Sequence, residues 1–127
     1  MSKPALIPVP TEHQEQVAFI QECDYLGPPF NRVFAIPNGG DRHPAVGAKL
    51  KAEGVRSGIP DLFLPIVRLP YHGLFIEMKR QKGGKLSTDQ EKKIRHLIAA
   101  GYAVIVPEGA VEAMHWTHKY LKGEKIC

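Results

Sequence analysis

The chain has 127 residues, of which 43% are hydrophobic and 24% are charged. This length suits one domain with a single core, and the composition excludes an intrinsically disordered or a fibrous protein. Lys and Arg number 17 against 13 Asp and Glu, so the formal charge of +4 mildly favours an anionic partner. The two cysteines, Cys23 and Cys127, lie far apart, which argues against a zinc knuckle and against a disulfide-rich scaffold.

Residues 1–10 predict an extended N-terminal arm, because their prolines remove backbone donors and disfavour a helix. This arm lacks the apolar core of a signal peptide, and no uncharged apolar run in the chain approaches the roughly 20 residues of a membrane helix. We therefore expect a soluble, cytoplasmic protein with no membrane partner and no small-molecule cofactor. Residues 11–127 are expected to form one domain.

Helices and a short strand alternate in the first part of this domain. Thr11 is a suitable N-cap for a helix over residues 12–25. Residues 32–36 predict a short strand. Residues 44–53 then predict a short helix with a basic outer side, which stops at Gly54.

The centre of the domain predicts two paired strands. Residues 61–67 and 71–78 are rich in Leu, Ile, Phe and Val over strand-like lengths. Residues 68–70 form a connection short enough for a hairpin-like turn, which makes the two strands antiparallel neighbours.

Two further helices enclose another strand in the last part of the chain. Ser87 predicts the N-cap of an amphipathic helix that ends at Gly101, residues 102–106 predict a buried strand, and residues 108–121 predict a closing helix. The order is α-β-α-β-β-α-β-α, which defines an α/β fold class. The apolar residues expected to face inward from these two helices are Ile94, Leu97, Ile98, Val111, Met114 and Leu121.

Two ionisable residues at the end of an apolar strand are the most informative feature of the sequence. Side chains alternate along a strand, so Glu77 and Lys79 point to the same face. A buried carboxylate needs a cation, and either Lys79 or a metal ion would serve Glu77. The alternative interpretation of this Glu-x-Lys pair is an exposed strand edge decorated with charge.

Asp61 adds a second carboxylate to this pair of strands. It begins the preceding strand next to Pro60, where hairpin pairing can bring its side chain near Glu77. Two carboxylates held close repel each other, and a divalent cation converts that repulsion into a binding site. Oxygen ligands of this kind favour Mg²⁺ or Mn²⁺ over zinc. By itself, an Asp at a strand start is often only a turn residue.

Four motifs, in the right order and spread over most of the domain, resemble the VRR-NUC branch of the PD-(D/E)XK nucleases. One departure is Ser57, since the segment for which the branch is named reads Val-Arg-Ser here in place of Val-Arg-Arg. Four ordered motifs make the resemblance specific, whereas a Glu-x-Lys pair alone would not. The matching residues are Glu12 and Gln16 in the first helix, residues 54–62 with Asp61, the segment Glu77 to Lys79, and residues 86–90 at the start of the third helix.

The resemblance implies a restriction-endonuclease-like core, in which helices flank a mixed central β-sheet. It also implies that Asp61, Glu77 and the carbonyl of Met78 are metal ligands and that Lys79 is catalytic.

The first helix offers a further acidic residue to this site. The resemblance implies that Glu12 holds a metal-bound water or completes the outer shell of ligands. Helical spacing supports this, because Glu12 continues the stripe from Gln16 to Cys23 and so should face inward. The alternative is an exposed first-turn Glu that complements the helix dipole, with Glu15 as the other candidate to face the site.

Gln90 has two interpretations. With Ser87 as N-cap, Gln90 occupies the third helical position and completes a capping box, a purely structural device. The resemblance implies in addition that Gln90 points at the site and helps to position Lys79 or a phosphate.

Substrate contacts are expected from loops whose cations and backbone donors can approach phosphates. Aromatic residues are not interleaved in these basic stretches, which favours contacts to the backbone of duplex or branched DNA. An ordinary solvated turn is the alternative. The expected DNA-binding residues are Asn38, Gly39, Arg42, Lys49, Arg56, Ser57, Lys82 and Lys85.

We therefore expect a Mg²⁺- or Mn²⁺-dependent DNA endonuclease that serves repair or recombination. Its substrate is expected to be branched DNA such as a four-way (Holliday) junction, cut by a homodimer with two symmetric sites. The alternatives are a non-catalytic DNA-binding module on a nuclease fold, and a nuclease that acts on RNA or on linear DNA ends.

Overall fold

The structure is a computed structural model, and it describes residues 8–37 and 43–126. The elements follow one another in the predicted order, with one 3-10 helix, η1 (Phe30–Arg32), added after the first helix. Within the described residues, no helix is both long and apolar enough to cross a membrane. The helices are α1 (Glu12–Leu26), α2 (Pro44–Ala52), α3 (Thr88–Ala99) and α4 (Ala110–Leu121), and the strands are β1 (Phe34–Ala35), β2 (Leu62–Leu64), β3 (Leu74–Ile76) and β4 (Ala103–Ile105).

The sheet is mixed, and its strands lie in the order β1-β2-β3-β4. β1 pairs with β2 and β2 pairs with β3 in antiparallel fashion, whereas β3 and β4 are parallel. The hairpin between β2 and β3 is closed by reciprocal backbone hydrogen bonds between Arg68 and Tyr71. The predicted α/β class, the mixed sheet and the antiparallel hairpin are thus confirmed.

Each strand is shorter than the segment predicted for it, and proline explains part of the difference. Proline has no N–H and cannot donate to a strand ladder. Pro65 directly follows β2, and Pro107 lies two residues beyond β4. The predicted strand over residues 61–67 was therefore wrong beyond Leu64.

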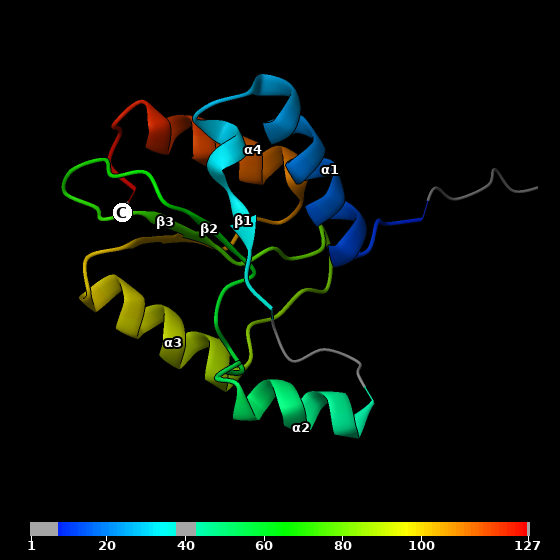
Figure 1. The fold of residues 1–127 in the computed structure, drawn as a ribbon. Helices are drawn as coiled ribbons and strands as arrows, with labels where there is room; N and C mark the ends of the chain where they lie inside the picture. The colour runs from blue at the N-terminus through cyan, green and yellow to red at the C-terminus, as the bar shows by residue number, and fades with distance from the viewer. Residues whose placement is uncertain (1–7, 38–42, 127) are drawn as a thin grey trace, which may run out of the picture.

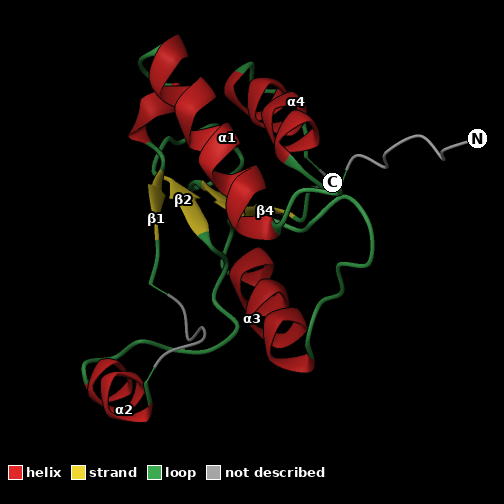
Figure 2. Ribbon diagram, turned by 90° about the vertical axis from the view of Figure 1, so that its right-hand side faces the viewer, coloured by secondary structure: helices red, strands yellow, loops and turns green. Residues whose placement is uncertain are grey.

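The two faces of the sheet bury different side chains. One face carries Leu and Ile residues and packs under α1 and α4, while α3 covers the opposite face (Figure 1, Figure 2). On the α3 side, the rings of Phe63, Phe75 and Tyr102 contact one another. The core under α1 and α4 contains Phe19, Cys23, Leu62, Leu64, Leu74, Ile76, Met78, Ala103, Ile105, Ala113, Met114 and Tyr120.

Two apolar residues that were expected to face inward are exposed. Val111 is 85% exposed and Ile98 is 51% exposed, so both predictions were wrong. Successive helical residues are separated by about 100° around the axis. Val111 therefore lies off the inner face of α4, which is formed by Ala110, Ala113, Met114, Thr117 and Tyr120.

Helix α2 stands apart from the rest of the domain (Figure 2). None of its residues is buried, and Val46 is 49% exposed. His43 caps its N-terminus, and Lys49 and Lys51 occupy its last turn. The predicted helix with a basic outer side is confirmed.

Candidate active site

The chain that follows β3 remains in the sheet because it pairs with the segment after β4. The Glu77 N–H donates to the Ile105 carbonyl at 2.9 Å. The Lys79 N–H donates to the Pro107 carbonyl at 3.0 Å. Since the N–H groups of an extended chain alternate in direction, the Met78 N–H between them points toward the β2 side.

The Asp61 side chain accepts the hydrogen bond that a backbone carbonyl would accept if the pairing of β2 with β3 continued to this position. The last cross-strand pair of β2 and β3 is Leu62 with Ile76. Beyond this pair, the Met78 N–H donates to Asp61 Oδ2 at 2.9 Å. Asp61 is thereby held beside the segment Glu77 to Lys79, as the hairpin predicted.

Glu77 is a buried carboxyl group next to a second acid. It is 2% exposed, and Oε1 has no hydrogen-bond partner among the described residues. Oε2 lies 3.7 Å from Lys79 Nζ, which confirms that the two side chains share a face. Burial raises the pKa of Glu77 to about 9, supported by a hydrogen bond with Asp61 and by its charge, while Lys79 opposes the shift. Glu77 therefore holds a proton at neutral pH when no cation is bound.

Lys79 is buried at the centre of a group of acceptors. Its ammonium donates to Gln90 Oε1 at 3.2 Å and lies 4.0 Å from Glu12 Oε1. Its aliphatic stem is covered by the following loop, where a Cβ placed on Gly84 would lie 3.1 Å from Lys79 Cβ. The ammonium is thus held in one position with its charge directed at Glu77.

Gln90 takes part in the capping box and also contacts Lys79. Its Oε1 accepts the Ser87 N–H at 2.9 Å, and its own N–H donates to Ser87 Oγ at 3.1 Å, which completes the capping box of α3. The same Oε1 also accepts from Lys79. The first turn of α3 therefore supplies an acceptor for the lysine ammonium.

The first turn of α1 contains two acidic residues, Glu12 and Glu15, and they differ in burial. Glu12 is exposed and reaches Lys79 from the rim of the site, so the expectation of an inward-facing Glu12 needs correction. Glu15 is the buried residue, and its carboxylate accepts from Gln81 Nε2 and from the Ala110 N–H. Helical spacing alone did not distinguish the two, because residues three apart share a face.

Two basic segments flank this group of residues. Gly58 packs against the start of α3, where a Cβ on it would lie 2.7 Å from the Asp89 backbone. The neighbouring Ser57 Oγ donates to Asp89 Oδ2 at 2.7 Å, a contact that the DNA-binding prediction did not foresee. On the other side, the loop with Gly84 covers Lys79.

The predicted DNA-binding residues stay predictions. Asn38, Gly39 and Arg42 lie outside the described residues. The others are exposed, on α2 or on the two segments beside the site, and they are Lys49, Arg56, Ser57, Lys82 and Lys85.

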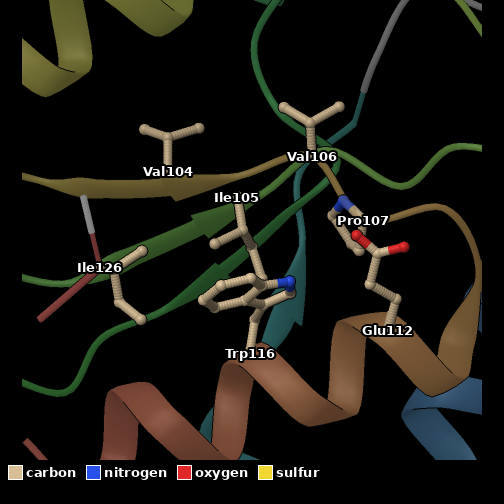
Figure 3. A pocket seen from close by; sticks show the side chains of 7 residues that line it. All are labelled: Val104, Ile105, Val106, Pro107, Glu112, Trp116 and Ile126. Atoms are coloured by element: carbon tan, nitrogen blue, oxygen red, sulfur yellow. The ribbon is translucent and has the colours of Figure 1, made fainter. Parts of the chain in front are cut away.

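An apolar cleft lies away from these residues, between β4 and α4 (Figure 3). Ile105 points into it toward Trp116, whereas Val104 and Val106 point to the opposite side of the strand. No predicted site residue lines the cleft. The candidate site is therefore a buried polar cluster at the point where β2 and β3 separate, and not an apolar pocket.

The cluster fits a hard divalent cation. The described residues contain no group of three or more His, Cys, Asp or Glu side chains arranged to hold a metal ion. Two carboxyl groups are nonetheless adjacent here, one with an oxygen that lacks a partner. In an extended chain the N–H and C=O of one residue point the same way, so the Met78 carbonyl is directed to the Asp61 side as a third oxygen donor. Such an all-oxygen set suits Mg²⁺ or Mn²⁺.

The chain is similar to known proteins both in structure and in sequence. A solved structure described as a VRR_NUC domain protein is similar to this chain with a TM-score of 0.79 and 27% sequence identity, and the match covers 93% of each chain. The family model described as VRR-NUC domain matches residues 11–110. No match was found among the curated proteins. The chain thus belongs to the VRR-NUC domain family, a family of nucleases, whose substrate is nucleic acid.

Proposed function

We propose that this chain is a Mg²⁺- or Mn²⁺-dependent DNA endonuclease whose active centre consists of Asp61, Glu77 and Lys79. The observation that carries the proposal is the buried Glu77 carboxyl, which has one oxygen without a partner and lies between a second acid and an ammonium. Such an arrangement is costly for stability. The cost is explained if the site binds a cation and a phosphate.

The protein residues would divide the work as follows. Asp61, Glu77 and the Met78 carbonyl would hold the cation. The cation, when bound, supplies an activated water and positive charge opposite the phosphate. The ammonium of Lys79 would donate to a phosphate oxygen and stabilise the charge that develops there.

Two further residues would keep that ammonium in place. Gln90, in the first turn of α3, accepts a hydrogen bond from the ammonium through Oε1, and Glu12 supplies a carboxylate from α1. Because Glu12 is exposed, it is also accessible to water at the rim of the site. Binding of a cation must displace the proton of Glu77, which favours binding at higher pH.

The basic segments on both sides of the site support DNA as the substrate. Lys82 and Lys85 on one side, and Arg56 with Lys49 of α2 on the other, are exposed and suited to contact phosphates. Since α2 projects from the domain, it extends this basic surface beyond the active centre. A broad basic surface around a small site is consistent with branched DNA.

A cleavage assay tests the proposal. Labelled linear, flapped and four-way-junction DNA, with RNA alongside, would be incubated with Mg²⁺, with Mn²⁺ or with a chelator. We expect cleavage of DNA with either ion, none with the chelator, and a loss of about 10²- to 10³-fold in Lys79→Ala. Equal rates in the chelator would exclude the metal role. Salt-dependent binding without any cleavage would instead identify a non-catalytic DNA-binding module.

We further propose that a homodimer cuts opposed strands of a four-way junction. The domain offers one active centre per chain, and two sites related by a two-fold axis match the symmetry of such a junction. Light scattering of the protein with bound junction DNA is expected to show two chains per junction. A complex with a single chain that still cuts both strands would contradict the dimer.

A further inference from the structure

Glu15 is a buried carboxylate that the proposed mechanism does not use. Glu15 lies on the inner face of α1 and is 6% exposed. Oε2 accepts from Gln81 Nε2 at 3.0 Å, and Oε1 accepts from the Ala110 N–H at 3.4 Å. Burial of a carboxylate is costly unless donors are directed at it. Here two donors from distant parts of the chain meet at Glu15.

One of these donors is the start of α4, a helix that lacks a cap of its own. Its N-cap is Gly109, which has no side chain to accept a backbone N–H. The first N–H groups of a helix need acceptors and favour a negative charge, and Glu15 supplies both from α1. A Cβ on Gly109 would lie 2.6 Å from Glu15 Oε2, so the glycine leaves the room that the carboxylate occupies.

These contacts form a closed ring through the proposed active centre. The Gly109 N–H donates to the Lys79 carbonyl at 2.9 Å, and the next residue, Ala110, donates to Glu15. One helical turn before Glu15, Glu12 Oε1 lies 4.0 Å from Lys79 Nζ. The backbone of Lys79 is thus linked through the start of α4 and through α1 to the Glu12 carboxylate, which faces the ammonium of Lys79.

We infer that Glu15 is a positioning residue, which fixes the rotation of α1 so that Glu12 faces Lys79. Residues three apart on a helix lie on one face, so two donors that hold Glu15 also set the direction of Glu12. Gln81 strengthens the link, because it lies only two residues after Lys79, at the start of the following turn. The inference rests on the proposed function, in which Glu12 serves the active centre.

Removal of Glu15 is expected to affect catalysis through Glu12. In Glu15→Ala we expect kcat to fall about 10- to 100-fold, as for residues that orient catalytic groups, with KM changed less than about twofold. Because the effect passes through Glu12, Glu12→Ala and Glu12→Ala/Glu15→Ala should have the same kcat within about threefold. Two independent losses that multiply would overturn the inference.

An exchange of the two partners gives a rescue test. In Gln81→Glu two carboxylates face each other, and we expect kcat to fall. In Glu15→Gln/Gln81→Glu the new amide at position 15 can accept from Ala110 through its oxygen and donate through its nitrogen to the new carboxylate at position 81. The double variant should recover most of the lost kcat. A folded double variant with no recovery would contradict the inference.

A control variant separates positioning from stability. Met114→Ala truncates a buried side chain of α4 that the site does not use, so it should lower Tm without lowering kcat at a temperature below both transitions. A Glu15→Ala protein whose kcat matches that of Met114→Ala would overturn the inference. Amide hydrogen exchange at Ala110 and in the first turn of α1 is expected to be faster in Glu15→Ala than in Met114→Ala. Hydrogen exchange does not depend on cleavage. If the parent protein cut no DNA, the proposed function would be rejected. The exchange rates would still decide whether Glu15 positions α1.

Discussion

Replacement of Asp61 by alanine is expected to lower DNA cleavage by at least about 10³-fold while the chain stays folded. The change removes one of two adjacent carboxyl groups and so removes an oxygen donor for the cation. It also leaves the Met78 N–H without its acceptor, a cost of about 1–3 kcal/mol that a domain of normal stability tolerates. Single-turnover cleavage with Mg²⁺ and a thermal melt of the same sample would measure the two effects.

A matched control for this variant is Glu91→Ala. Glu91 is an exposed carboxylate of α3 that pairs with Arg95 across one helical turn, and an exposed pair of this kind contributes little. Its removal changes the net charge by the same amount as Asp61→Ala, so a general effect of charge on DNA binding would appear in both variants. Cleavage by Asp61→Ala at the parental rate would reject Asp61 as a ligand.

The centre of the site could be predicted because it follows from local rules. Alternation along one strand placed Glu77 and Lys79 on the same face, and a short hairpin placed Asp61 opposite them. The capping box of Gln90 could likewise be predicted from four consecutive residues. Each of these features depends on neighbours in sequence or on one strand pairing.

The features that the sequence did not reveal depend on contacts between distant segments. Glu12 and Glu15 share a face of α1, and only the arrival of Gln81 and Ala110 decides which of them is buried. The contact of Gln90 with Lys79 was implied only by the resemblance to the family, because it requires the packing of α3 on the sheet. No periodicity within one helix contains this information.

A second error concerned which residues of α4 face the core. Val111 was assigned to the inner face of α4, where Ala110 and Ala113 lie instead. Small residues are weak hydrophobic signals in a sequence, yet they line this face.

The end of β2 could have been predicted from the sequence, because Pro65 directly follows the strand and proline cannot donate to a strand ladder.

Glu77 links the stability of the protein to its activity. Burial, with the help of Asp61, raises its pKa from the ordinary value of 4.5 to about 9. The folded state therefore binds this proton more tightly than the unfolded chain does. The resulting contribution to the free energy of unfolding is complete below pH 4.5 and is lost as the pH rises toward 9.

Replacement of Glu77 by glutamine is expected to stabilise the cation-free protein and to abolish cleavage. The amide has nearly the same shape, can donate to Asp61 as the protonated acid does, and never has to ionise in the core. We expect Glu77→Gln to raise Tm by at least about 5 °C at pH 8 in the presence of a chelator, and by much less at pH 5, where the parent also keeps its proton. Thermal unfolding of both proteins at the two pH values measures this difference. Because a neutral amide replaces a carboxylate ligand, single-turnover cleavage should fall at least about 10³-fold. The same pH dependence of Tm in both proteins would show that Glu77 ionises normally, and cleavage at the parental rate would show that the cation does not need its charge.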